Sequence, residues 1–259
     1  MKLNIVPASR GIQWVKLGMQ TFFKQPLALS GLFFIFLAVM SLLNVLPMLG
    51  SVLAFVLMPG VTLGLMAASR EASNGKFPMP TILVTAFRAG AQQRRHMLVL
   101  GALYTVCIVL IVCVTPLIDG GGFAKIMLLG QAPSTEARQE MDFQWAMLFA
   151  SGLNMPLTLL FCHASALIHW HGLRPVKSLF FGLAAIVGNF RAFVVYGLVW
   201  MGVFLGFGII MALLVAALGG VETVAVMAYP AAMLIATMVF TSLYFTFQGS
   251  FEFTPGDDT

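Results

Sequence analysis

Six apolar runs, each long enough to cross a bilayer as a helix, constrain the fold of this chain more than any other feature. A transmembrane helix needs about 20 predominantly apolar residues. The runs are continuously apolar, which excludes the in–out alternation of barrel strands. The sequence therefore predicts an all-α fold, a polytopic transmembrane bundle of six helices that forms a single domain over residues 1–259. The spans lie at about residues 27–46, 48–69, 97–118, 143–168, 192–218 and 223–247.

The composition supports a lipid-facing surface. Hydrophobic residues make up 60% of the chain and charged residues only 9%, whereas a soluble domain carries about 25% charged residues. The net charge of +5 does not indicate nucleic-acid binding, because the charges lie at the ends of apolar runs and not on one basic face. Three cysteines lie inside apolar runs without the spaced pairs of a disulfide framework: Cys107, Cys113 and Cys162.

The basic residues predict the orientation in the membrane. If the N-terminus is cytoplasmic, twelve basic residues lie inside, and only Lys125 and Arg138 lie outside. The asymmetry of lysine and arginine in short loops sets topology, so both termini are expected in the cytoplasm. The twelve are Lys2, Arg10, Lys16, Lys24, Arg70, Lys76, Arg88, Arg94, Arg95, Arg174, Lys177 and Arg191.

A three-fold repeat is the second organisational signal. The segments before the first, third and fifth spans begin at Pro7, Pro80 and Pro175 and then show apolar residues at helical spacing. We predict short amphipathic helices at about 8–24, 80–90 and 175–190, which suit the headgroup plane of the membrane. Alternatively, their apolar faces pack on the bundle as cytosolic caps. The first such face is expected to contain Ile12, Val15, Met19 and Phe22.

The second span of each pair carries an interior proline, Pro59, Pro156 or Pro230. The pattern therefore predicts three copies of one unit, an interfacial helix followed by a transmembrane hairpin. The middle copy adds a long external loop at about 119–142, which is expected to begin with a flexible glycine run after the third span.

The interior prolines also suggest a candidate intramembrane polar site. Proline removes a backbone donor and kinks a helix, so three kinked helices are expected to splay and leave a cavity. Asn154, Pro156 and His163 are its candidate lining residues. Asn154 has an alternative role in capping a freed carbonyl. His163 is a functional candidate as an ionisable residue inside the membrane, or a structural hydrogen-bonding group.

Three histidines gather at the end of the fourth span, at His163, His169 and His171. At about 100° per residue, none of these pairs has the i, i+4 spacing that places two imidazoles on one face for zinc. We therefore predict no metal site and no cofactor. A structural role at the membrane interface is the expectation for His169 and His171.

The stretch "ALIHWHGLRPVKSLFFGLAAIVGNFRAFVVYGL" (166–198), with "VPASRGIQWVKLGMQTFFKQPLALSGLF" (6–33) and "GKFPMPTILVTAFR" (75–88), resembles an uncharacterised family of six-helix bacterial inner-membrane proteins, proteobacterial in type. The resemblance implies the bacterial inner membrane and implies no reaction. The sequence departs from the family pattern at Ser165, where proline is expected, and at Gly182, where serine is expected. The family-like motif consists of Trp170, His171, Gly172, Pro175, Lys177 and Asn189.

The first functional hypothesis is a non-enzymatic protein that binds membrane lipids, anionic ones among them, or a partner membrane protein or second copy. Five basic residues are its candidate headgroup contacts: Arg88, Arg94, Arg95, Arg174 and Lys177. Each would contribute about 1 kcal/mol near an anionic surface; alternatively, they determine topology alone. A transporter or channel for a small or amphiphilic solute, using the polar site at residues 154–163, is the alternative. An intramembrane metal-binding protein or enzyme ranks last.

Overall fold

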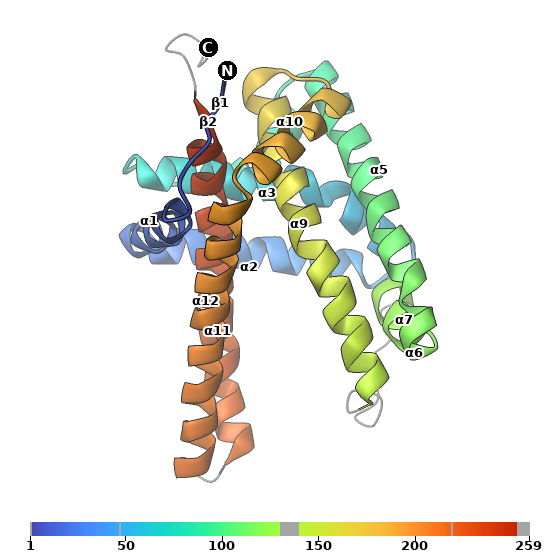
Figure 1. Ribbon diagram of the computed structural model, residues 1–259, viewed down its shortest axis with the longest axis vertical. Helices are drawn as coiled ribbons and strands as arrows, with labels where there is room; N and C mark the ends of the chain where they lie inside the picture. Colours follow the sequence, from blue (N-terminus) through green and yellow to red (C-terminus); the bar gives the residue numbers. More distant parts are fainter. Residues whose placement is uncertain (1, 47, 130–139, 219, 253–259) are drawn as a thin grey trace. The chain divides into compact units, whose positions relative to one another are not determined.

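The computed structural model describes residues 2–46, 48–129, 140–218 and 220–252, which are almost entirely helical (Figure 1). Two short strands, β1 (Lys2–Leu3) and β2 (Phe251–Glu252), pair antiparallel and bring the two ends of the described chain together. The helices are α1 (Arg10–Lys24), α2 (Pro26–Leu43), α3 (Leu49–Ser73), η1 (Pro80–Val84), α4 (Thr85–Arg88), α5 (Ala91–Val114), α6 (Pro116–Asp119), α7 (Gly122–Leu129), α9 (Met141–His171), α10 (Pro175–Gly188), α11 (Phe190–Leu218) and α12 (Val221–Ser250).

Six helices are long and apolar enough to cross a membrane, which confirms the predicted all-α fold with six spans. They are Pro26–Leu43, Leu49–Ser73, Ala91–Asp119, Met141–His171, Phe190–Ala217 and Val226–Ser250. Each interior proline lies within a helix that continues on both sides of it, in α3, α9 and α12. The three-fold repeat and the splaying of the helices stay predictions.

The chain divides into two compact units, whose boundaries fall inside α2, α3, η1 and α10. The first unit comprises Met1–Phe33, Leu65–Ile82 and Ala184–Thr259. The second unit comprises Phe34–Gly64 and Leu83–Leu183. The single domain expected from the sequence likewise stays a prediction.

In the first unit, α11 and α12 form a long hairpin and α1 lies across it, near the paired strands (Figure 1). Trp14 of α1 is buried against Phe193, with ring centroids 5.1 Å apart, and against Tyr196 at 6.3 Å. Gly18 permits this close packing, because a Cβ atom there would meet the backbone of Ser242. The first predicted amphipathic helix therefore packs on protein.

The packed face of α1 is rotated from the predicted one. Ile12, expected on that face, is 53% exposed, whereas Trp14 is 2% exposed. Gly11 and Gly18 lie on the buried side of α1 and allow its backbone to approach α11 and α12 closely. A hydropathy pattern does not mark these two positions, because glycine has no apolar side chain. Val15 and Phe22 are buried as expected.

In the second unit, α5 packs along α9, and Tyr104 contacts Phe161 with ring centroids 5.1 Å apart. Leu83 of η1 packs directly against Gly64 of α3, where a Cβ atom would lie 2.6 Å from the Leu83 Cα. A Cβ atom at Gly60 would similarly meet the ring of Phe87. These two glycines of α3 thus serve helix packing within the chain.

The expected external loop is partly helical in the structure. The carboxylate of Asp119 accepts hydrogen bonds from the backbone N–H groups of Gly121, at 2.9 Å, and Phe123, at 2.6 Å. This capping begins α7, and Phe123 then packs near Phe143 of α9 at 6.3 Å. The glycine run predicted as a flexible exit is therefore a capped turn between two helices.

Candidate functional site

The predicted polar residues of α9 do not form one site. Asn154 and His163 are nine positions apart, which places them about 180° apart around the helix and about 13 Å apart along it. Asn154 and Pro156 are exposed. His163 is fully buried and faces α10, near the position that a Cβ atom on Gly182 would occupy. The structure therefore separates an exposed amide from a packed imidazole.

Asn154 lines a cavity of about 420 Å³ in the second unit. Most of the lining is apolar, and the polar exceptions are Tyr104, Ser151 and Asn154. The hydroxyl of Tyr104 is hydrogen-bonded to Thr158, which lies one helical turn after Asn154. The lining residues are Phe55, Met58, Tyr104, Ile108, Ile111, Val112, Phe123, Met127, Met147, Ala150, Ser151 and Asn154.

His169 and His171 lie in the last turn of α9. Gly172 ends this helix in the left-handed conformation, at φ 62°, and its N–H donates to the Ile168 carbonyl. The rings of His169 and Trp170 lie 6.5 Å apart. Within the described ranges, no group of three His, Cys, Asp or Glu side chains is placed to hold a metal ion.

The family-like motif supplies the two turns that connect α9, α10 and α11. Gly172 ends α9, Pro175 begins α10, and Asn189 separates α10 from α11. A proline at the first helical position has the fixed φ that a helix start requires. Trp170 and His171 are half-buried, and Lys177 is exposed. The residues of the family-like motif therefore lie at or near the ends of these helices.

The two residues that depart from the family pattern are both buried. The Ser165 hydroxyl donates to the Cys162 carbonyl within α9, at 2.8 Å. Gly182 packs against Leu160, where an added Cβ atom would lie 3.2 Å from the carbonyl oxygen and a side-chain carbon. Neither residue lines the cavity.

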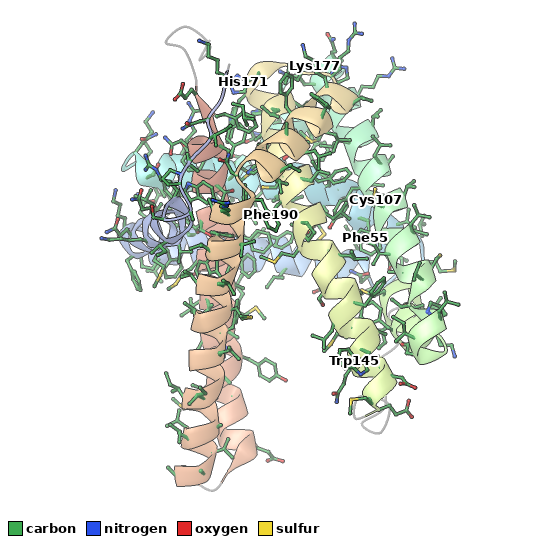
Figure 2. The ribbon with its side chains drawn as sticks, in the orientation of Figure 1. Phe55, Cys107, Trp145, His171, Lys177 and Phe190 are labelled. Atoms are coloured by element: carbon green, nitrogen blue, oxygen red, sulfur yellow. The ribbon has the colours of Figure 1, made fainter. Side chains whose placement is uncertain are left out.

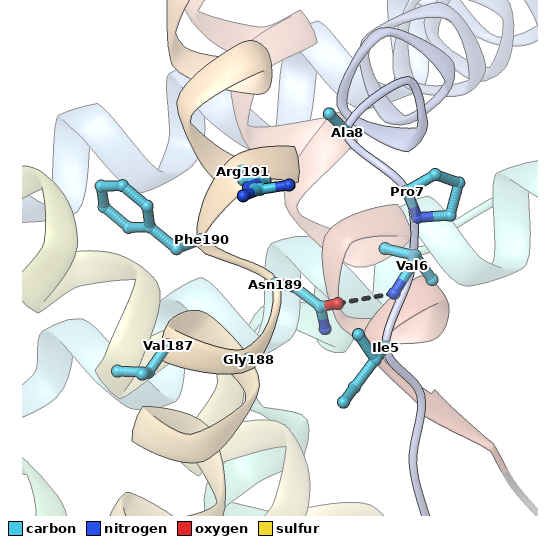
Figure 3. A pocket seen from close by; sticks show the side chains of 9 residues that line it. All are labelled: Ile5, Val6, Pro7, Ala8, Val187, Gly188, Asn189, Phe190 and Arg191. Carbon is cyan, nitrogen blue, oxygen red and sulfur yellow. Dashed lines mark hydrogen bonds between the residues drawn. The ribbon is translucent and has the colours of Figure 1, made fainter.

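A groove of about 550 Å³ lies in the first unit, beside the junction of α10 and α11 (Figure 3). The Asn189 side chain supports one wall, because its oxygen accepts a hydrogen bond from the Val6 N–H at 2.8 Å. Its amide nitrogen donates to the Asn4 carbonyl at 2.9 Å. The groove is lined by Ile5, Val6, Pro7, Ala8, Val187, Gly188, Asn189, Phe190 and Arg191.

This groove was not predicted from the sequence. Arg191 was expected only as a topology determinant, but in the structure this cation lines the groove together with two exposed apolar residues, Val187 and Phe190. The walls come from chain segments about 180 positions apart, so periodicity within a segment carries no signal of their meeting. Among the residues of the family-like motif, Asn189 is the one that lines this groove.

The five candidate headgroup contacts are all exposed and all lie in the second unit. Arg88 ends α4, and Arg94 and Arg95 lie in the first turns of α5. The Gln93 amide donates to the His169 carbonyl at 3.4 Å, so the start of α5 lies beside the end of α9. Figure 2 shows His171 and Lys177 at this same end of the unit, opposite Trp145.

No protein-family model matches the sequence, and no solved structure matches it. The chain is 37% identical over 254 residues to a protein of Burkholderia thailandensis named "Probable inner membrane protein". The alignment covers 97% of this chain and 94% of that protein. Together with six membrane-spanning helices, this likeness identifies a multi-pass protein of the inner membrane. The chain belongs to this family of bacterial inner membrane proteins.

Proposed function

We propose that this protein is a non-enzymatic inner-membrane protein that binds anionic phospholipids in the leaflet next to its termini. One observation carries the proposal: α10 exposes a stripe of apolar side chains between basic residues. The bilayer is the occupant that matches both features, since its hydrocarbon accepts the stripe and its headgroups accept the cations.

The stripe consists of Val176, Phe180, Leu183 and Val187. Their spacing keeps the four side chains within about 60° of each other around the helix. They are 75%, 67%, 51% and 66% exposed, respectively. Water contact would cost about 25 cal/mol for each Å² of this apolar surface. Such a helix is therefore suited to lie in the plane of the headgroups with its stripe toward the acyl chains.

Basic residues flank α10 at both ends. Arg174 immediately precedes the helix, Lys177 lies in its first turn, and Arg191 follows its end. Near an anionic surface each cation contributes about 1 kcal/mol. Arg174 and Lys177 are both exposed, so lipid headgroups can reach their side chains.

The groove at the end of α10 supports recognition of a phosphate. Arg191 and the beginning of the 29-residue helix α11 both supply positive potential there. A helix start combined with a cation is a common arrangement for anions. Ile5, Val187 and Phe190 are exposed apolar residues in the same groove, which matches a molecule that carries both an anion and a hydrocarbon chain.

Helix α1 also has the faces expected of a helix at the membrane interface. Besides its packed side, it carries Ile12, Met19 and Phe23 within about 40° of each other. Ile12 and Phe23 are exposed, and Met19 is half-buried. Lys16 and Gln20 are exposed on the neighbouring side. Protein packing and interfacial placement are thus compatible on this one helix.

We further propose that the groove and both termini face the cytoplasm. Pairing of Lys2 with Glu252 places the two ends of the described chain on one side of the first unit. Asn189 is hydrogen-bonded to Val6, so the groove lies on that side too. The excess of basic residues in the same segments favours the cytoplasm for this side.

Spin-labelled lipids test this function in reconstituted vesicles. We expect electron paramagnetic resonance to show several-fold preference of the protein for phosphatidylglycerol over phosphatidylcholine. The combined change Arg174→Gln, Lys177→Gln and Arg191→Gln should remove most of this preference and leave the helical circular dichroism unchanged. Lys125→Gln, at an exposed position of α7, is the control. Equal affinity of the unaltered protein for both lipids would show that the basic residues determine topology alone.

A further inference from the structure

We propose that the second unit binds one uncharged, largely apolar molecule with a hydroxyl or carbonyl group, in the cavity beside Asn154. This site differs from the proposed phospholipid surface in place and in chemistry. Its walls come from α3, α5, α7 and α9, and every lining residue belongs to the second unit.

The size and lining of the cavity match a small-molecule site. Ligand pockets usually measure about 300–1,000 Å³ and combine apolar walls with a few polar groups. This cavity measures about 420 Å³ and has nine apolar lining residues among its twelve. Met58, Met127 and Met147 are among them. Flexible methionine side chains adapt to irregular shapes, so the walls favour a range of hydrophobic molecules over a single rigid one.

Charge selects the kind of ligand. Among the described residues that line the cavity there is no Asp, Glu, Lys, Arg or His. An ionised group would lose its hydration there without a compensating partner, which is costly in a medium of low polarity. The cavity therefore favours neutral molecules and disfavours both fatty-acid anions and phospholipid headgroups.

Asn154 supplies the polar anchor. It lies about 20 Å from the start of α9 and about 26 Å from its end, at 1.5 Å per residue. Within the part of the chain that the structure describes, its side-chain amide has no hydrogen-bond partner. An unsatisfied amide at such a depth is unfavourable. Ser151, one turn earlier, lines the same cavity, so a ligand hydroxyl or carbonyl would find both a donor and an acceptor.

The cavity wall formed by α7 is fixed in place. Asp119 caps the beginning of this helix through two backbone N–H groups. Phe123 is buried and packs near Phe143, which anchors α7 on α9. Met127, one turn later, lines the cavity. The connection between α5 and α9 therefore contributes a built wall to this site.

Photo-crosslinking of the full-length protein in phosphatidylcholine vesicles tests the proposal. The probe is a long-chain alcohol that carries a diazirine and an alkyne. We expect crosslinks on the α5, α7 and α9 peptides that contain lining residues, and competition by oleyl alcohol but not by oleate. Asn154→Leu should reduce labelling about fivefold, as expected for the loss of one hydrogen bond. Leu153→Ala, an exposed neighbour outside the cavity, should label normally.

A second variant keeps the test decisive if Asn154→Leu fails to fold. Met147→Trp fills the cavity and should abolish competable labelling while the protein keeps its elution volume. Labelling that spreads evenly over all lipid-facing helices, or that survives Met147→Trp, would overturn the proposal. Equal competition by oleate and oleyl alcohol would overturn it as well. The vesicles contain no anionic lipid, so failure here is distinguishable from failure of the phospholipid proposal.

Discussion

The Asn189 side chain joins the N-terminal segment to the start of α11 through the backbone of Val6, 183 positions earlier, at 2.8 Å. Asn189 is 1% exposed and donates a second hydrogen bond, to the Asn4 carbonyl. One amide thus satisfies a backbone donor and a backbone acceptor that would otherwise lie unpaired beside the groove. These two hydrogen bonds give Asn189, the last residue of the family-like motif, a structural role.

Asn189→Leu should therefore destabilise the protein by about 2–4 kcal/mol, because two backbone groups lose their partner. Thermal unfolding in mild detergent, followed by circular dichroism, measures the change. Asn4→Ala is the matched control, since the Asn4 side chain makes a single hydrogen bond to the rest of the described structure, to the Gly249 carbonyl at 3.2 Å. It should cost only about 1 kcal/mol. Equal stability of the two variants would contradict the assigned role of Asn189.

Two glycines, each four positions from another glycine, should respond differently to alanine. Gly64→Ala places a methyl group against the Leu83 backbone, and overpacking of this kind costs about 1–3 kcal/mol. At Gly202, a Cβ atom would meet nothing within 4 Å among the described residues. Gly202→Ala should be neutral or stabilising by up to about 1 kcal/mol, because alanine favours helix. Unfolding of both variants in one detergent compares them, and a destabilised Gly202→Ala would contradict the expectation.

These two glycines show which features of helix packing can be predicted from the sequence and which cannot. Gly64 is paired with Gly60 and Gly202 with Gly206 in the small-xxx-small pattern that favours close helix packing. Hydropathy predicted the helices that carry both pairs. The pattern does not reveal that Gly64 meets η1 while Gly202 faces open space, because that depends on which elements meet in three dimensions. The same limit applies to α1, whose packed face includes Gly11 and Gly18 as well as the apolar residues expected from spacing, Val15 and Phe22.

The candidate site was likewise predicted only in part from the sequence. Asn154 and His163 were expected as lining residues of one cavity, whereas the continuous helix α9 places them on opposite faces. The cavity itself needed α7, and the sequence predicted a loop there, since glycines 120–122 favour turns. The structure shows that the Asp119 carboxylate caps α7 and that Phe123 packs near Phe143, and these contacts make the segment a wall.

Tyr196→Phe should weaken the attachment of α11 to α12 in the first unit. The Tyr196 hydroxyl is buried and lies 2.7 Å from the Ser242 hydroxyl. Loss of this one hydrogen bond should cost about 1 kcal/mol, which thermal unfolding resolves. Tyr229→Phe is the control, because Tyr229 is 71% exposed and its hydroxyl has little to lose. A similar cost at both positions would argue against a specific role for the buried pair.

The orientation of the chain in the membrane gives the last prediction. The predicted topology assigns twelve basic residues to the segments that share a side with the termini and two to the other side, and such asymmetry favours the cytoplasm for the basic segments. A fluorescent protein fused after Thr259 should therefore fluoresce, and alkaline phosphatase inserted between residues 131 and 138 should be active, which requires export. The reciprocal fusions are the controls and should give neither signal. Reporters that place residues 131–138 and the C-terminus in the same compartment would contradict the odd number of crossings between these two sites, and with it the cytoplasmic placement of the α10 groove.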